Sequence, residues 1–97
     1  MKDLFSVRGK VALVTGGSRG IGLMIARGFV ANGAKVYISA RKRDELDTAK
    51  AELSREGDVV TVPADLSTEA GCNALAAEIA RSERALHVLV NNAGANW

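Results

Sequence analysis

The chain is 97 residues long and carries a formal net charge of +2, with 47% hydrophobic and 25% charged residues. These values indicate one soluble domain of modest size, and the small charge excess argues against nucleic acid or a membrane surface as a partner. No run approaches the roughly 18 consecutive apolar residues that would span a bilayer, and the single Cys72 excludes an intrachain disulfide, so we expect a cytoplasmic protein.

Two strands and two helices are predicted in the first 57 residues. Residues 10–15 (KVALVT) form a short, β-branched apolar run, which is typical of a buried strand. Residues 20–32 have apolar side chains at helical spacing, and the Asn-Gly pair that follows Ala31 is a helix stop signal. Residues 34–40 (AKVYISA) predict a second strand, and residues 43–57 predict an amphipathic helix that ends at a glycine.

The second part of the chain repeats this alternation. Residues 58–64 (DVVTVPA) predict a third strand with Pro63 at its end, because proline cannot donate to a central ladder. A helix is predicted from an N-cap at Ser67 to about Ser82, and residues 87–94 predict a fourth strand that runs into a turn. Strands that alternate with helices indicate an α/β fold with a doubly wound parallel sheet, and right-handed crossovers give the strand order 3-2-1-4.

The turn after the first predicted strand, TGGSRGIG at residues 15–22, is rich in glycine. Gly16, Gly20 and Gly22 would close the strand and open a helix, whose N-terminus offers free N–H groups and a partial positive charge. A phosphate or pyrophosphate is the natural ligand there, because glycine permits close backbone approach. The spacing G-x-x-x-G-x-G is neither the common G-x-G-x-x-G fingerprint nor a Walker A loop. Taken alone, the turn is also compatible with a tight connection that binds nothing.

A second motif, NNAG at residues 91–94, ends the fourth predicted strand as the glycine turn ends the first. Together with Asp65 after the third strand, the two motifs resemble the T-G-x-x-x-G-[I/L]-G and N-N-A-G signatures of the short-chain dehydrogenase/reductase family. The resemblance covers residues 7–94 and implies the N-terminal half of a Rossmann-type sheet. Within the family the chain looks most like the 3-oxoacyl-[acyl-carrier-protein] reductases, and Trp97, soon after NNAG, is similar to the rhamnolipid-synthesis type.

The resemblance implies a row of cofactor contacts at the carboxyl edge of the sheet. Around the pyrophosphate and its adjoining ribose it places Gly16, Ser18, Arg19, Gly20, Ile21 and Gly22. Beside the adenine it places Asp65 and Leu66, and on the ribose and nicotinamide side it places Asn92, Ala93 and Gly94. We expect Asn91 to tie strands together, and Asn92 to meet the cofactor through its backbone rather than its amide.

The end of the second strand decides which nicotinamide cofactor is expected. An acidic residue there would bind both ribose hydroxyls of NAD and repel a 2′-phosphate. This strand ends in SAR (39–41), and no carboxylate follows before Asp44. Arg41 can hold a 2′-phosphate through two hydrogen bonds, with Arg19 reaching the same group, whereas residues 42–43 fit a solvated helix start. The sequence therefore predicts NADP(H).

The residues that would transfer a proton are not found in the chain. The family's chemistry requires a tyrosine as general acid, a lysine four residues later and a serine that polarises the substrate carbonyl. The only tyrosine, Tyr37, lies inside the second predicted strand and is followed four residues later by Arg41, so we expect it to be structural, like His87. We predict no catalytic and no metal-binding residue.

Residues 1–97 are thus expected to form the N-terminal dinucleotide-binding part of a single short-chain dehydrogenase/reductase domain whose catalytic part is absent. The resemblance implies a parent enzyme, often a tetramer, that reduces a 3-oxoacyl-type carbonyl of a small-molecule or acyl-carrier-bound substrate with NADPH, and it implies that these 97 residues alone are inactive. The alternative is a stand-alone module that binds NADP(H) without turnover. The fourth strand, HVLV, would be an uncovered hydrophobic edge.

Overall fold

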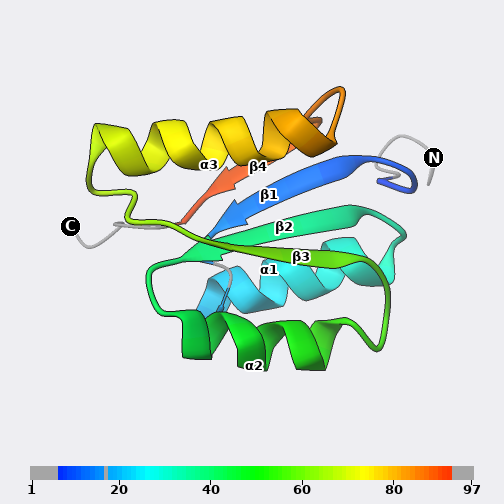
Figure 1. Cartoon of the computed structure of the whole chain (residues 1–97). Helices are drawn as coiled ribbons and strands as arrows, with labels where there is room; N and C mark the ends of the chain where they lie inside the picture. The colour runs from blue at the N-terminus through cyan, green and yellow to red at the C-terminus, as the bar shows by residue number, and fades with distance from the viewer. Residues whose placement is uncertain (1–6, 17, 93–97) are drawn as a thin grey trace.

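The computed structural model describes residues 7–16 and 18–92. Four strands alternate with three helices along the chain (Figure 1). The elements are β1 (Val11–Thr15), α1 (Gly20–Ala31), β2 (Lys35–Ala40), α2 (Arg43–Leu53), β3 (Val59–Pro63), α3 (Glu69–Ser82) and β4 (Val88–Asn91). None of the helices in this part of the chain combines the length and the apolar composition that crossing a membrane requires.

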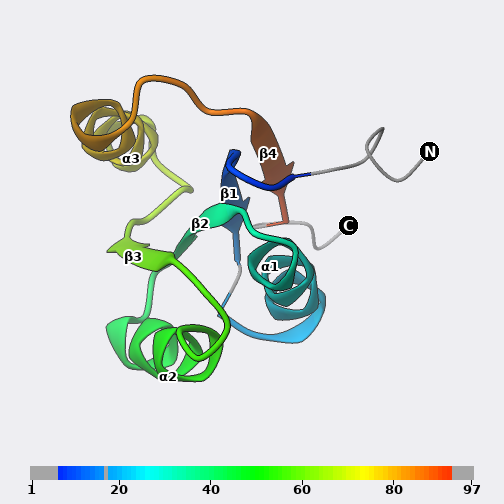
Figure 2. The same cartoon turned by 90° about the vertical axis from the view of Figure 1, so that its right-hand side faces the viewer.

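The four strands form one parallel sheet in the order β3-β2-β1-β4, which confirms the predicted topology. Val14 of β1 lies opposite Ile38 of β2 on one side and Val90 of β4 on the other. Helices α1 and α2 cover one face of the sheet and α3 covers the other, as the end-on view shows (Figure 2). This is a doubly wound arrangement, and it brings the carboxyl ends of all four parallel strands to one edge.

Each face of the sheet has its own core, because successive side chains of a strand point to opposite faces. In β2, Val36 and Ile38 pack toward α1 and α2, whereas Tyr37 between them packs toward α3. The core under α1 and α2 is the larger, and its buried members are Ala12, Val14, Ala26, Val30, Ala34, Val36, Ile38, Leu46, Ala49, Leu53 and Val59. The core under α3 consists of Val11, Leu13, Tyr37, Leu75 and Ile79.

Two helix ends differ from the prediction. Helix α2 ends at Leu53, its last buried residue, and the chain then turns, with the N–H of Glu56 donating to the carbonyl of Leu53 (2.9 Å). The N-cap of α3 is Thr68 rather than Ser67: the Thr68 hydroxyl accepts from the N–H of Gly71 (2.9 Å). Both hydroxyls could cap a helix, and Ser67 is instead held by a neighbouring carboxylate.

Pro63 lies where the sequence predicts, and two residues expected to be structural, Tyr37 and His87, have structural partners. Pro63 is the last residue of β3, an edge strand. The Tyr37 hydroxyl donates to Glu83 at the end of α3 (2.7 Å), and the Tyr37 side chain is buried. His87 accepts a hydrogen bond at Nδ1 from the N–H of Val11 (2.9 Å), which fastens the start of β4 to β1.

Candidate cofactor-binding site

The glycine turn joins β1 to α1 at the carboxyl edge of the sheet. Gly16 and Gly20 have φ angles of +69° and +62°, in the left-handed region that side chains disfavour. The N–H of Gly16 donates to the carbonyl of Ser39 (2.7 Å), so the turn is fixed against the end of β2. The first helix therefore starts at the sheet edge, with its N-terminus beside the ends of the strands.

Gly22 is required for a different reason, which is the close packing of α1 against the turn. A Cβ atom at Gly22 would lie 2.2 Å from the carbonyl oxygen of Gly16 and 2.9 Å from the amide nitrogen of Asn92. The contact with Gly16 is with backbone and would require the chain to move, whereas the contact with Asn92 is with the end of its side chain. Gly22 thus sets the distance between the first helix, the turn and the end of β4.

A hollow of about 520 Å³ lies beside the turn, and we call it the strand-end hollow. Its lining comes from the turn, from the ends of β2 and β3 and from the start of α2. The lining residues are Gly16, Ser18, Arg19, Ala40, Arg41, Glu45, Ala64, Asp65, Leu66 and Ser67. Six of them, Gly16, Ser18, Arg19, Arg41, Asp65 and Leu66, were predicted from the sequence as cofactor contacts, and the fold brings these six together.

The acidic wall of the hollow is Asp65, directly after β3. Its Oδ1 accepts from both the N–H (3.0 Å) and the hydroxyl (2.6 Å) of Ser67. The side-chain and backbone hydrogen bonds from Ser67 hold the pKa of Asp65 below its ordinary value, and the positive charge of Arg41 lowers it further. Asp65 is therefore a carboxylate near neutral pH, with its position set by the loop that leads to α3.

Glu45 is a member of the hollow that sequence reasoning missed. It lies in the first turn of α2, and its Oε1 accepts from the Ser18 hydroxyl (3.3 Å). Its Oε2 lies 3.7 Å from a guanidinium nitrogen of Arg19 and 4.0 Å from Nζ of Lys42. No motif contains Glu45, because its approach to the glycine turn depends on how α2 packs beside α1.

The remaining predicted contacts that the structure describes, Gly20, Ile21, Gly22 and Asn92, do not line the strand-end hollow. Gly20 and Ile21 start α1, and the Ile21 side chain is exposed. Asn91 accepts at Oδ1 from the Thr15 hydroxyl (3.0 Å), in accord with its expected role between strands. The N–H of Asn92 donates to the same hydroxyl (2.8 Å), so this backbone group is already engaged. Ala93 and Gly94 lie outside the described residues.

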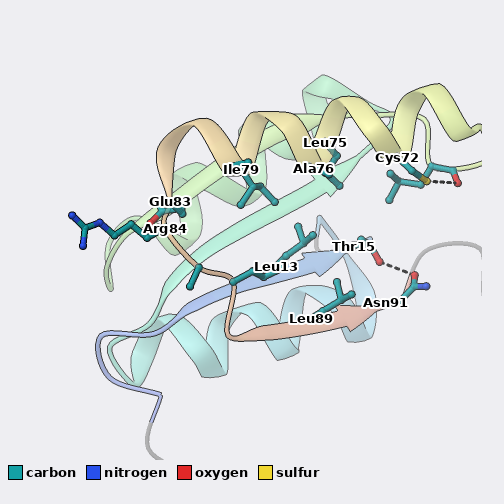
Figure 3. Close-up of a pocket in the computed structure, with 14 residues that line it drawn as sticks. Leu13, Thr15, Cys72, Leu75, Ala76, Ile79, Glu83, Arg84, Leu89 and Asn91 are labelled. Atoms are coloured by element: carbon teal, nitrogen blue, oxygen red, sulfur yellow. Dashed lines mark hydrogen bonds between the residues drawn. The ribbon is translucent and has the colours of Figure 1, made fainter.

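A second hollow, of about 530 Å³, lies between α3 and the β1–β4 pair (Figure 3). We call it the apolar hollow, because most of its wall is aliphatic. Leu13, Leu75, Ile79 and Leu89 point into it in the close-up, and the Thr15–Asn91 hydrogen bond closes one end. Apart from Leu66, it shares no residue with the strand-end hollow, and its lining offers no pair of cations for a phosphate.

Comparison with known proteins places this geometry in a family. Residues 10–97 match the family model described as short chain dehydrogenase. The chain belongs to the short-chain dehydrogenase family. One relative is the rhamnolipids biosynthesis 3-oxoacyl-[acyl-carrier-protein] reductase of Pseudomonas aeruginosa, 48% identical over 97 residues. That alignment covers all of this chain and 38% of the reductase, so this short-chain dehydrogenase chain spans little more than a third of that relative's length.

Solved structures of the family superpose closely on the chain. The RhlG/NADP active-site complex of Pseudomonas aeruginosa has a TM-score of 0.90 at 49% identity, over 96% of this chain and 36% of that one. The L-sorbose reductase of Gluconobacter frateurii, complexed with NADPH and L-sorbose, has a TM-score of 0.89 at 38% identity, over 95% of this chain and 36% of that one. The short-chain dehydrogenase chain thus has the strand order and helix placement of these structures' corresponding third.

Proposed function

We propose that the chain is the cofactor-binding part of an NADP(H)-dependent short-chain oxidoreductase, with residues 1–97 forming the N-terminal portion of its dinucleotide-binding domain. The observation that carries the proposal is the strand-end hollow, where Arg41, directly after a β2 strand that lacks an acidic residue, shares the lining with Arg19 of the glycine turn. Two similar structures contain NADP or NADPH, which supports the same cofactor. The single cysteine supports a cytoplasmic location.

The residues present fit an adenosine diphosphate with a 2′-phosphate. The left-handed glycines and the start of α1 suit a pyrophosphate, which we assign to Gly16, Ser18, Arg19, Gly20, Ile21 and Gly22. We assign the 2′-phosphate to Arg41 and Arg19, because guanidinium groups bind phosphate through paired hydrogen bonds. Adenine is assigned to Asp65 and Leu66, where the Asp65 carboxylate can accept from an amino group.

The ribose and nicotinamide side is assigned to Asn92, Ala93 and Gly94. Because the Asn92 N–H donates to Thr15, any backbone contact from Asn92 to the cofactor would use its carbonyl. When bound, NADPH supplies a hydride for reducing a carbonyl to an alcohol. We propose a 3-oxoacyl-type substrate, small or carried on an acyl carrier, on the basis of the similarity to the Pseudomonas aeruginosa reductase. We also propose a tetrameric parent enzyme, which the family resemblance of the sequence motifs implies.

None of the described residues is assigned to proton transfer. Tyr37 is buried within β2 and bonded to Glu83, and His87 is bonded to Val11. These engagements support the inference that the 97 residues bind cofactor without turnover. A stand-alone NADP(H)-binding module would share this property, and the two readings agree on every residue of the hollow.

The experiment that tests the proposal is a calorimetric titration of the wild-type chain and of the Arg41→Asp variant with NADPH and with NADH. We expect the variant to lose affinity for NADPH about ten- to a hundredfold, because a charge-assisted hydrogen bond of about 1.5–3 kcal/mol is replaced by repulsion. The affinity of the variant for NADH should stay the same or increase.

Arg43→Asp is the matched control, since it changes the net charge equally but does not line the hollow. Its preference for NADPH should stay that of the wild type. An Arg41→Asp variant with an unchanged preference for NADPH over NADH would contradict the assignment of the 2′-phosphate to Arg41.

A further inference from the structure

The carboxylate of Glu45, on the first turn of α2, lines the strand-end hollow together with that of Asp65. Its side chain is 27% exposed, and its two oxygens contact two neighbouring residues of the glycine turn, Ser18 and Arg19. Ser18 is buried, whereas the Arg19 side chain is 80% exposed. Glu45 thus forms an ion pair with Arg19, the arginine of the glycine turn. Because the Arg19 side chain is exposed to solvent, this ion pair is weak and readily exchanged.

The position of Glu45 identifies which part of a cofactor would meet it. The hollow that contains Glu45 also contains Arg41 and Asp65, which follow β2 and β3. It does not include residues 20–22, the start of α1, where N–H groups are available to a pyrophosphate. Glu45 therefore stands where the glycine turn meets the adenosine side of the site. On that side the only anion that distinguishes NADP(H) from NAD(H) is the 2′-phosphate.

We propose that Glu45 is a specificity-determining residue that occupies the place of the 2′-phosphate in the cofactor-free chain. This inference rests on the proposed function. A 2′-phosphate that binds Arg19 separates Arg19 from Glu45 and then lies near a carboxylate whose remaining ion pair, with Nζ of Lys42, spans 4.0 Å. Contacts of Arg19 with the pyrophosphate are common to both cofactors, and a ribose with a free 2′-hydroxyl adds no negative charge beside Glu45. The repulsion between Glu45 and a 2′-phosphate therefore falls on NADP(H) alone, and the residue reduces the preference that Arg19 and Arg41 create.

The test is the variant Glu45→Gln, which keeps the size of the side chain and an oxygen for the Ser18 hydroxyl while removing the charge. We expect the dissociation constant for NADPH to fall about fivefold, in keeping with the strength of an exposed ion pair. The constant for NADH should change less than twofold. The fragment 2′,5′-ADP should gain as much affinity as NADPH, and 5′-AMP should gain none.

Glu52→Gln is the matched control, because Glu52 lies on the same helix and pairs with Arg27 outside the hollow. It should bind both cofactors as the wild type does. A loss of NADPH affinity in Glu45→Gln would show that the carboxylate orients Arg19 and would overturn the inference. An equal gain with NADPH and NADH would place Glu45 at the pyrophosphate and would also overturn it.

These outcomes are separate from failure of the proposed function. If the wild-type chain binds neither cofactor, or prefers NADH, the NADP(H) assignment is wrong whatever Glu45→Gln does. If the wild type prefers NADPH and the variant's preference does not increase, the assignment stands and only the role of Glu45 is rejected. Raised salt supplies a further check, since it should shrink the difference between wild type and Glu45→Gln in NADPH affinity.

Discussion

At Gly22, a single missing methyl group determines whether the first helix can approach the cofactor turn. We predict that Gly22→Ala destabilises the chain by about 1–3 kcal/mol and abolishes NADPH binding, because the new Cβ would meet the backbone of Gly16, which has no rotamer to change. Urea denaturation gives the free energy of unfolding, and NADPH titration gives the binding.

Gly28→Ala is the matched control on the same helix. A Cβ at Gly28 meets nothing within 4 Å, and the residue has no positive φ. Replacing glycine by alanine in a helix interior should therefore raise the free energy of unfolding by roughly 0.5–1 kcal/mol. If Gly22→Ala were as stable as Gly28→Ala and bound NADPH, the close approach would not be needed.

At the scale of the element, the end of α3 is fastened to β2 by one carboxylate. Glu83 Oε2 lies 2.5 Å from Nζ of Lys35 and accepts from the Tyr37 hydroxyl at 2.7 Å. The hydrogen bond from Lys35, followed by that from Tyr37, holds the pKa of Glu83 below its ordinary value of 4.5. A carboxyl group whose pKa is lower in the folded chain contributes stability above 4.5, and this contribution is lost as the pH falls through the folded value.

We predict that acidification below pH 4.5 weakens the wild type more steeply than the Glu83→Gln variant. The variant starts less stable at neutral pH, because it lacks the charge that Lys35 and Tyr37 engage. Thermal melts between pH 7 and pH 3, monitored by circular dichroism, give the two slopes. Glu78→Gln, on the same helix with a surface partner in Arg81, should keep the wild-type slope. Identical acid slopes for Glu83→Gln and wild type would contradict the linkage.

The elements also show which features a sequence can specify. Strand order followed from the alternation of strands and helices, because parallel strands joined by right-handed crossovers have few arrangements. The N-cap residue of α3 could not be predicted from the sequence, because the hydroxyls of Ser67 and Thr68 are equally able to cap a helix. In the structure the Ser67 hydroxyl donates to Asp65 instead, and Thr68 is the cap. Glu45 could not be found either, because its contact with Ser18 joins residues 27 positions apart through the packing of two helices. Short motifs encode the turn, whereas tertiary contacts determine its neighbours.

At the scale of the whole molecule, the described sheet has two edges of different character. The β3 edge ends in Pro63, which cannot donate to an added strand. The β4 edge has no further strand beside it among residues 7–16 and 18–92. Leu89 in this strand is 60% exposed and lines the apolar hollow under α3. An exposed strand edge next to an apolar wall favours association with another chain.

We therefore predict that the 97-residue chain self-associates as its concentration rises, and that Leu89→Lys suppresses this association. A charge on the edge strand opposes pairing, because it would have to be buried against the partner. Sedimentation velocity over a concentration series measures the effect. Met24→Lys is the matched control: Met24 is 71% exposed but lies on α1, on the opposite face of the sheet, so its variant should associate like the wild type. A wild type that sediments as a monomer throughout would refute the prediction. Equal suppression by Met24→Lys would assign the association to net charge rather than to the β4 edge.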